Sequence, residues 1–118
     1  TSMFSMFYKS GLVGNTYIND WDMSNLHNLE QMFCYATKFN APVNDWNTSK
    51  VTNLISVFYD ANQFNQKVDK WDTQNVTHMK TSFKLTPSFL NHNLSGWSVS
   101  EVRNHKDFMQ NTGSGNTE

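Results

Sequence analysis

The sequence is poor in residues that cross-link or charge a protein chain. One cysteine, Cys34, stands alone among 118 residues, which excludes an internal disulfide framework. Only 16% of the residues are charged, and 9 basic and 10 acidic side chains give a net charge of −1. A nearly neutral chain lacks the basic surface that nucleic acid attracts, so we expect no nucleic-acid partner.

Long apolar runs are also missing. A membrane-spanning helix needs about 20 consecutive apolar residues, and no stretch comes close, so we expect no direct membrane insertion of this segment. Aromatic residues are plentiful instead: nine Phe, four Trp and four Tyr make up 14% of the chain. This content argues against disorder throughout, and the length suits a single domain.

Internal repeats are the main feature of the sequence. Tryptophans recur at spacings of 25, 25 and 26 residues, at Trp21, Trp46, Trp71 and Trp97. A phenylalanine column has nearly the same period, at Phe7, Phe33, Phe58, Phe83 and Phe108. A third apolar column contains Val13, Phe39, Phe64 and Phe89. Chance does not align several apolar columns over four units, so the period is secure.

Each unit combines two apolar patterns. Val51, Leu54, Phe58 and Ala61 follow the i, i+3, i+7, i+10 spacing of one helical face. Apolar residues of one parity over 39–43 predict a short extended segment. We therefore predict an α/β fold in which each coil has a short strand or arc, a turn and a short helix.

A single unit of this size cannot bury its apolar face, whereas stacked units can. We predict a solenoid of about four to five coils over residues 1–110, as one domain. The first and last units are incomplete, so we expect the chain to be an excerpt of a longer array. The polar residues 111–118 predict a flexible tail.

Three stretches carry a family resemblance. They are MFCYATKFN at 32–40, VFYDANQFNQ at 57–66 and FNQKVDKWDTQNVTHM at 64–79. They resemble the 25-to-26-residue repeat of BspA-like bacterial surface proteins, found in mycoplasma and Listeria-type lipoproteins. The resemblance covers roughly residues 3–109. It implies a right-handed, leucine-rich-repeat-like α/β solenoid, an extracellular or cell-surface location, and adhesion or another protein interaction. The matching positions are structural, so no catalytic residues carry over.

Stacked carboxylates raise the question of a metal site. Asp20 and Asp45 share a repeat column, so adjacent coils would place them about 5 Å apart. A calcium ion could join them, but the dense oxygen-ligand loop of an EF-hand is missing. Asp22, Asn47 and Asp72 share another column and are interpreted as turn and capping residues. We predict no metal and no cofactor.

Catalysis is not indicated either. Cys34 has no neighbouring base in the sequence, so we interpret it as an incidental thiol. An enzyme needs one unique polar cluster, whereas repeated columns place the same groups in every coil. The histidines lack metalloprotease spacing and fall in different columns: His27, His78, His92 and His105. We predict a non-catalytic protein.

The repeated aromatic columns predict a buried core, with an exposed, sugar-stacking row of tryptophans as the alternative. The predicted core residues are Trp21, Trp46, Trp71, Trp97, Phe33, Phe58, Phe83, Phe39, Phe64 and Phe89.

Repeat proteins place recognition at positions that vary between coils over a constant core. The extended half of the units offers such a face, and its residues are Tyr17, Asn19, Asp20, Asn44, Asp45, Lys67, Asp69 and Lys70. We predict that this face binds a host-surface or matrix protein, or a glycan. Two alternatives stay open: a carbohydrate-binding module that uses exposed aromatics such as Tyr8 and Tyr59, and a structural spacer or assembly component of a cell envelope or virion.

Overall fold

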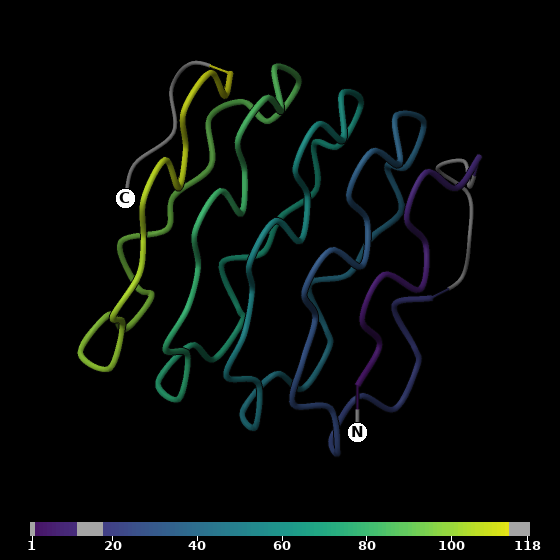
Figure 1. Cartoon of the computed structure of the whole chain (residues 1–118). Helices are drawn as coiled ribbons and strands as arrows, with labels where there is room; N and C mark the ends of the chain where they lie inside the picture. The colour runs from purple at the N-terminus through teal and green to yellow at the C-terminus, as the bar shows by residue number, and fades with distance from the viewer. Residues whose placement is uncertain (1, 12–17, 114–118) are drawn as a thin grey trace.

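The computed structural model describes residues 2–11 and 18–113. Successive repeats lie side by side, from the N-terminal repeat at one edge of the molecule to the C-terminal repeat at the other (Figure 1). The body is compact, with principal extents of 32 × 30 × 20 Å. No α-helix and no strand longer than a single bridge occurs in these two ranges. The repeats are linked instead by isolated parallel bridges: Ser2 to Asn28, Asn28 to Asn53, Asn53 to His78 and His78 to Asn104.

The prediction of a right-handed, leucine-rich-repeat-like α/β solenoid with a strand and a helix in each coil is therefore wrong. The segment expected to be helical, 51–61, contains Ser56 with φ 53° and Asp60 with φ 54°. A left-handed residue cannot continue a right-handed helix, so each of them ends any helical turn that precedes it. The apolar spacing was real, but tight turns produce it here: Val51, Leu54 and Val57 are buried three residues apart.

Consecutive β-turns replace the helix. Turns 29–32 and 33–36 are closed by hydrogen bonds of 3.1 and 3.0 Å from the fourth N–H to the first carbonyl. Their third residues, Gln31 and Tyr35, both have φ 58°. A positive φ at that place defines a type II turn. We call each run of two consecutive turns, such as 29–36, an arc. The third residue of both turns has a positive φ in every arc, and these residues are Ser5, Lys9, Gln31, Tyr35, Ser56, Asp60, Thr81, Leu85, Asp107 and Asn111.

Backbone hydrogen bonds between repeats use the N–H groups that do not close the turns. Within 29–35, every second N–H donates to a carbonyl of 53–59 in the next repeat, at 2.8–3.0 Å. The same alternation joins 54–60 to 78–84 at 2.8–2.9 Å. The intervening N–H groups close turns within their own repeat. Almost every backbone donor of the arc is satisfied without regular secondary structure.

Aromatic rings form the core as parallel stacks along the molecule. Phe33 and Phe58 are stacked with ring centroids 5.5 Å apart and an interplanar angle of 4°. Trp46 and Trp71 stack at 6.2 Å and 8°, and Trp97 continues the row at 6.2 Å and 7°. Phe58 also lies 3.9 Å from Phe64 of the next column. All six rings are buried, and the same is true of Phe39, Phe83 and Phe89.

Trp21 differs from the other tryptophans because its side chain is 38% exposed, against 3% for Trp46 and Trp71. Trp46 donates its indole N–H to the carbonyl of Ile18, 28 residues earlier. Among the described residues no repeat precedes Trp21 to supply such a carbonyl. Its ring contacts Phe7 at a centroid distance of 6.0 Å.

The phenylalanine column changes register in the last repeat. Phe108 follows Phe83 by 25 residues, but the left-handed Asp107 follows Thr81 by 26. Met109 therefore takes the position equivalent to Phe83, and Phe108 moves one place along. Its ring meets Phe83 at 90° and 5.4 Å instead of stacking on it. Of the predicted flexible tail 111–118, residues 114–118 lie outside the described ranges.

Replacing Trp71 by Ala should lower the free energy of unfolding by ~3–5 kcal/mol, the scale of large-to-small core substitutions. Trp71 is buried and its indole N–H donates to the carbonyl of Val43, so both packing and a hydrogen bond are lost. Trp21→Ala should cost clearly less, because Trp21 already contacts solvent. Urea unfolding followed by circular dichroism measures both. Equal losses for the two variants would contradict the stacked core.

Candidate functional site

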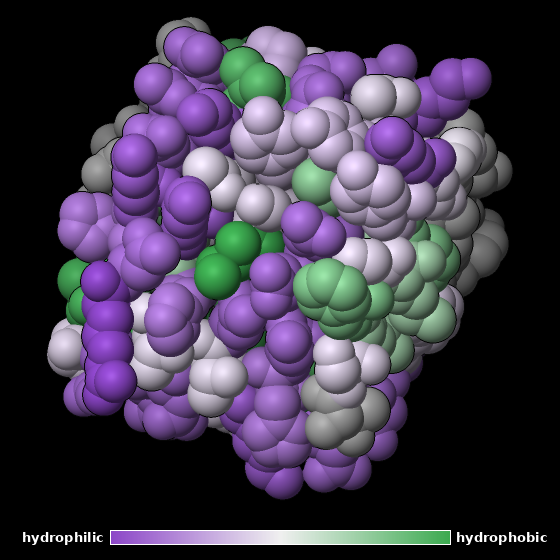
Figure 2. All heavy atoms as spheres, viewed as in Figure 1, coloured by the Kyte–Doolittle hydropathy of each residue, from purple (hydrophilic) through white to green (hydrophobic). Residues whose placement is uncertain are grey.

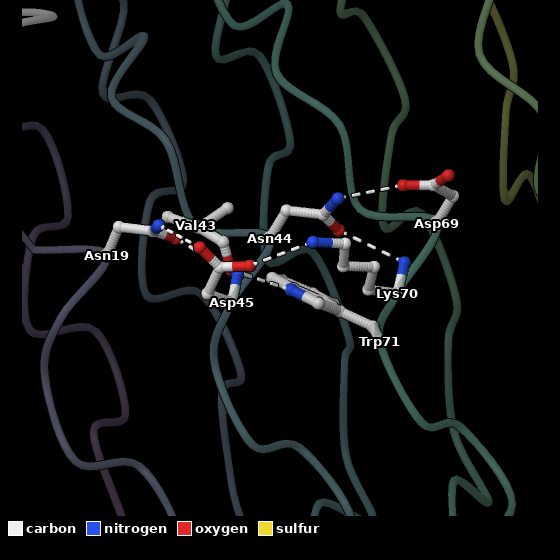
Figure 3. Close-up of polar contacts among 7 residues, drawn as sticks. All are labelled: Asn19, Val43, Asn44, Asp45, Asp69, Lys70 and Trp71. Atoms are coloured by element: carbon white, nitrogen blue, oxygen red, sulfur yellow. Dashed lines mark hydrogen bonds and ion pairs between the residues drawn. The ribbon is translucent and has the colours of Figure 1, made fainter.

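The predicted recognition face lies on tight turns whose backbone carbonyls accept hydrogen bonds from buried tryptophan side chains. The turn at 43–46 is closed by a 3.3 Å hydrogen bond from the N–H of Trp46 to the carbonyl of Val43. The same carbonyl accepts the indole N–H of Trp71 at 2.9 Å, from the next repeat (Figure 3). The carbonyls of Ile18 and Val68 accept indole bonds in the same way, at 2.7 and 2.9 Å. The backbone under the site is therefore tied to the buried ring stack.

Side chains on neighbouring turns are joined by a ladder of hydrogen bonds. The Nδ2 of Asn19 donates to Asp45 Oδ2 at 2.7 Å, and the backbone N–H of Asp45 donates to Asn19 Oδ1 at 3.0 Å. One repeat further on, the Nδ2 of Asn44 donates to Asp69 Oδ1 at 2.8 Å, and the N–H of Lys70 donates to Asn44 Oδ1 at 3.1 Å (Figure 3). Each asparagine thus fixes both the backbone and a carboxylate of the next repeat.

An exposed ion pair completes this ladder. Lys70 Nζ lies 3.1 Å from Asp45 Oδ1, and both side chains are more than half exposed. A pair so open to water contributes little to stability. The hydrogen bond from Lys70 and then that from Asn19 lower the pKa of the Asp45 carboxyl. The Asp45 carboxylate is therefore held charged and oriented, with acceptor capacity on the surface.

A shallow, open groove of about 560 Å³ runs beside the ladder. Its lining is mostly amide and charged side chains, with Pro42 and Leu90 as apolar members. Those members of the predicted face that line it are Asn19, Asn44, Asp45, Lys67 and Lys70. Figure 2 shows that the molecular surface in the view of Figure 1 is largely hydrophilic, with hydrophobic groups in separate small patches.

Sequence reasoning missed a second amide ladder in the same groove. Asn40 Oδ1 accepts the backbone N–H of Asn65 at 2.7 Å, and Asn65 Oδ1 accepts the N–H of Leu90 at 3.0 Å. The ring Nε2 of His92 also lies 2.7 Å from Asn65 Oδ1. Burial lowers the pKa of His92, which favours a neutral imidazole at neutral pH. The recurrence of Asn directly after Phe39 and Phe64 was the available signal.

The remaining members of the predicted face have other surroundings. Asp69 is exposed and contacts Asn44 without lining the groove. Asp20 is exposed and lies outside the groove lining. Tyr17 lies outside the described residues.

Asp45, one of the two stacked carboxylates of the calcium hypothesis, has other partners. Asp45 bonds to the side-chain amide of Asn19 and to the ammonium group of Lys70, and neither partner is a carboxylate. Over residues 2–11 and 18–113, no three His, Cys, Asp or Glu side chains gather closely enough to hold a metal ion. Asp22 and Asp72 accept backbone N–H bonds two residues further on, at 3.0 Å, which makes them Asx-turn residues.

A row of tyrosines lies on the arcs, and the groove is lined by other segments of the repeats. Tyr8 and Tyr35 meet edge to face at 5.6 Å, and Tyr35 and Tyr59 do so at 5.4 Å. Lys9 Nζ lies 5.4 Å from the ring centroid of Tyr8 and 5.7 Å from that of Tyr35. Tyr8 is 40% exposed, while Tyr35 and Tyr59 are partly buried.

Cys34 is buried beside this row. Burial, with a smaller contribution from the charge of Asp60, raises the pKa of the Cys34 thiol to about 11. The thiolate is the reactive form, so a raised pKa suppresses nucleophilic chemistry at neutral pH.

The Cys34 thiol should react with a water-soluble disulfide reagent at pH 8 about a hundredfold more slowly in the folded chain than in urea, because both thiolate fraction and access fall. The folded pKa lies above the unfolded value, so this group should also lower stability progressively as the pH rises above ~8.5. Absorbance of the released thiol measures the reaction rate, and Cys34→Ser gives the blank. Equal rates in the two states would contradict a buried thiol.

In a carboxyl NMR titration, the Lys70→Met substitution should move the pKa of Asp45 back up toward its ordinary value, because the strongest stabilising bond to the carboxylate is lost. Lys67→Met is the matched control, since Lys67 is exposed and makes no bond to Asp45. The Asp45 pKa is depressed in the folded state, so its contribution to stability is present at neutral pH and disappears as pH falls through the folded pKa. An unmoved Asp45 titration in Lys70→Met would contradict the ladder.

Comparison with known proteins places the chain in a family. The model of the family described as "Mycoplasma protein of unknown function, DUF285" matches residues 1–118, so the chain belongs to this family. No curated protein and no solved structure gives a significant match. The match supports the mycoplasma part of the predicted resemblance; the BspA-like part stays a prediction. The described residues contain no helix that is long and apolar enough to cross a membrane.

Proposed function

We propose that this member of a family of unknown function is a non-catalytic, BspA-like interaction module that binds a partner protein through the groove beside the asparagine ladder. The partner class is a host-surface or matrix protein, and the setting is the cell surface. The observation that carries the proposal is the fixed geometry of the groove side chains. Asn19, Asn44 and Asp45 are each held by hydrogen bonds to a neighbouring repeat.

Rigid side chains favour recognition because ordering flexible groups opposes binding by about 0.5–1.5 kcal/mol for each immobilised side chain. Here the ordering is already done by the fold, since the turns are tied to the tryptophan stack. The groove offers both carboxylate and amide acceptors and the cations of Lys67 and Lys70. This mixture suits a polar protein surface that hydrogen-bonds at several points, with specificity set by the residues that differ between repeats.

Lys67 gives the sharpest test of this groove. It is exposed, lines the groove and makes no hydrogen bond or ion pair within the described residues. In a screen against extracellular-matrix and host-surface proteins, the chain should bind a protein whose affinity falls about tenfold or more in Lys67→Glu. Lys80→Glu is the matched control, because Lys80 is exposed outside the groove and receives the same change of charge.

Binding that both variants retain equally would overturn the proposal, and so would the absence of any protein ligand for folded chain. The latter result would favour the spacer or assembly role.

A glycan ligand is the second candidate, and the tyrosine row is the observation that favours it. A parallel glycan array should then give a hit that Tyr8→Ala weakens and Lys67→Glu does not, because the tyrosine row lies on the arcs and the groove is lined by other segments of the repeats.

A further inference from the structure

The amide donors of the groove are used in its earlier repeats and open in a later one. The Nδ2 of Asn19 donates to Asp45 at 2.7 Å, and the Nδ2 of Asn44 donates to Asp69 at 2.8 Å. Asn65 also lines the groove, but its Nδ2 makes no hydrogen bond within residues 2–11 and 18–113. A partner that approaches Asn65 therefore meets unused donors.

The orientation of the Asn65 amide follows from the groups that it meets. The backbone N–H of Leu90 lies 3.0 Å from Oδ1, and because an N–H can only donate, the amide atom that it faces is the carbonyl oxygen. The ring Nε2 of His92 lies 2.7 Å from the same oxygen, and this ring stacks on Phe89 with centroids 4.1 Å apart. With Oδ1 held by these contacts, both hydrogens of the Nδ2 group stay available to a ligand.

Lys67 adds a cation on the same segment. It stands two residues after Asn65, is exposed and makes no hydrogen bond or ion pair within the described residues. Burial lowers the pKa of His92, and the positive charge of Lys67 adds to this effect while Asp69 opposes it. The ammonium group of Lys67 is therefore within electrostatic reach of the ring that contacts Asn65.

The charges of the groove lining favour a ligand with a single negative charge. The charged lining residues are Lys67, Lys70 and Asp45, so with a neutral His92 one positive charge is in excess. Lys70 lies 3.1 Å from Asp45, which leaves the excess at Lys67. A dianion such as phosphate would carry more charge than this excess balances. A carboxylate has one charge and two acceptor oxygens, which matches one ammonium group and one amide NH2 group.

We propose that the partner protein places the carboxylate of an aspartate or glutamate side chain between Asn65 and Lys67. One oxygen accepts a hydrogen bond from Nδ2 of Asn65, and the other accepts one from Nζ of Lys67. Leu90 is 39% exposed and lines the same groove, so it offers an apolar contact to the methylene groups of the acidic side chain. The inference rests on the proposed function and adds the chemical group that the groove recognises.

Two capped peptides that differ only in the carboxylate supply the probe: acetyl-Gly-Glu-Gly-amide and acetyl-Gly-Gln-Gly-amide. Amide-resolved NMR spectra are recorded at about pH 7.5, where His92 is neutral. The glutamate peptide should shift the side-chain NH2 signals of Asn65, with a dissociation constant on the order of 1–10 mM. The glutamine peptide should bind about tenfold more weakly. Equal binding of the two peptides, or no binding of either, would overturn the proposal.

The Asn65→Asp substitution removes the donor and keeps the acceptor. The new carboxylate still accepts the N–H of Leu90, so the fold is retained, but it repels the peptide, which should bind about tenfold or more weakly. Asn47→Asp is the matched control, because Asn47 is exposed, accepts a backbone N–H at 3.1 Å and lies outside the groove lining. The control should stay within about twofold of the natural chain. Binding is followed by the backbone signal of Lys67, and equal losses in the two variants would contradict the site.

The Lys67→Met substitution tests the cation. It should weaken binding of the glutamate peptide about tenfold, because a charge-assisted hydrogen bond is lost. Lys80→Met is the matched control, since Lys80 is exposed outside the groove lining and loses the same charge. Binding that survives unchanged in Lys67→Met would overturn the proposal. The dispersed amide spectrum of each variant checks that it is folded.

Glucuronate carries the same carboxylate on a sugar, so its titration separates an acidic protein from an acidic glycan. Tighter binding of glucuronate or of inorganic phosphate than of the glutamate peptide would overturn the proposal. The proposed function fails independently of this inference. Peptide binding as expected, in a chain that finds no protein ligand, would support the carboxylate site and overturn the proposed function. A protein ligand that Lys67→Glu weakens and Asn65→Asp does not would keep the proposed function and overturn the carboxylate site.

Discussion

The rest of the structure depends on the hydrogen bond between a tryptophan side chain and the backbone of the preceding repeat. The indole N–H of Trp46, Trp71 and Trp97 reaches a carbonyl 28 or 29 residues earlier, at 2.7–2.9 Å. That carbonyl also closes the turn on which the groove side chains stand. One buried residue therefore sets the distance between repeats, fills the core and fixes the surface above it. A chain with so few charges and no disulfide needs such a link, because burial and backbone bonds carry nearly all its stability.

Repetition also explains why the surface of the groove is ordered. An asparagine in one turn meets the same turn of the next repeat, so its amide can bond both a backbone N–H and a side chain there. Asn19 and Asn44 do this in the same way in successive repeats. Low charge and high asparagine content are thus connected to the architecture: amides supply both a donor and an acceptor, which a ladder between identical turns requires.

The backbone hydrogen bonds between neighbouring repeats have the same origin. An arc that directs its N–H groups to one side and its carbonyls to the other can stack indefinitely, because every junction presents the next one with the same pattern. Closed folds avoid this property by pairing or covering their edges.

The sequence by itself determined the period and the aromatic columns, since large apolar residues at 25- and 26-residue intervals fit only a repeated unit. Much of the candidate groove was also within reach, because variable positions over constant ones could be read directly for Asn44, Asp45, Lys67 and Lys70. The local conformation of each repeat could not be predicted from the sequence. Spacings of three residues suit a helix or a series of tight turns, and only the tertiary structure decided between them. At Ser56 and Asp60 the left-handed backbone frees alternate N–H groups to bond the next repeat. In a helix those N–H groups would donate to carbonyls of the same helix, so neither the N–H groups nor the carbonyls would be available to bond the neighbouring repeat.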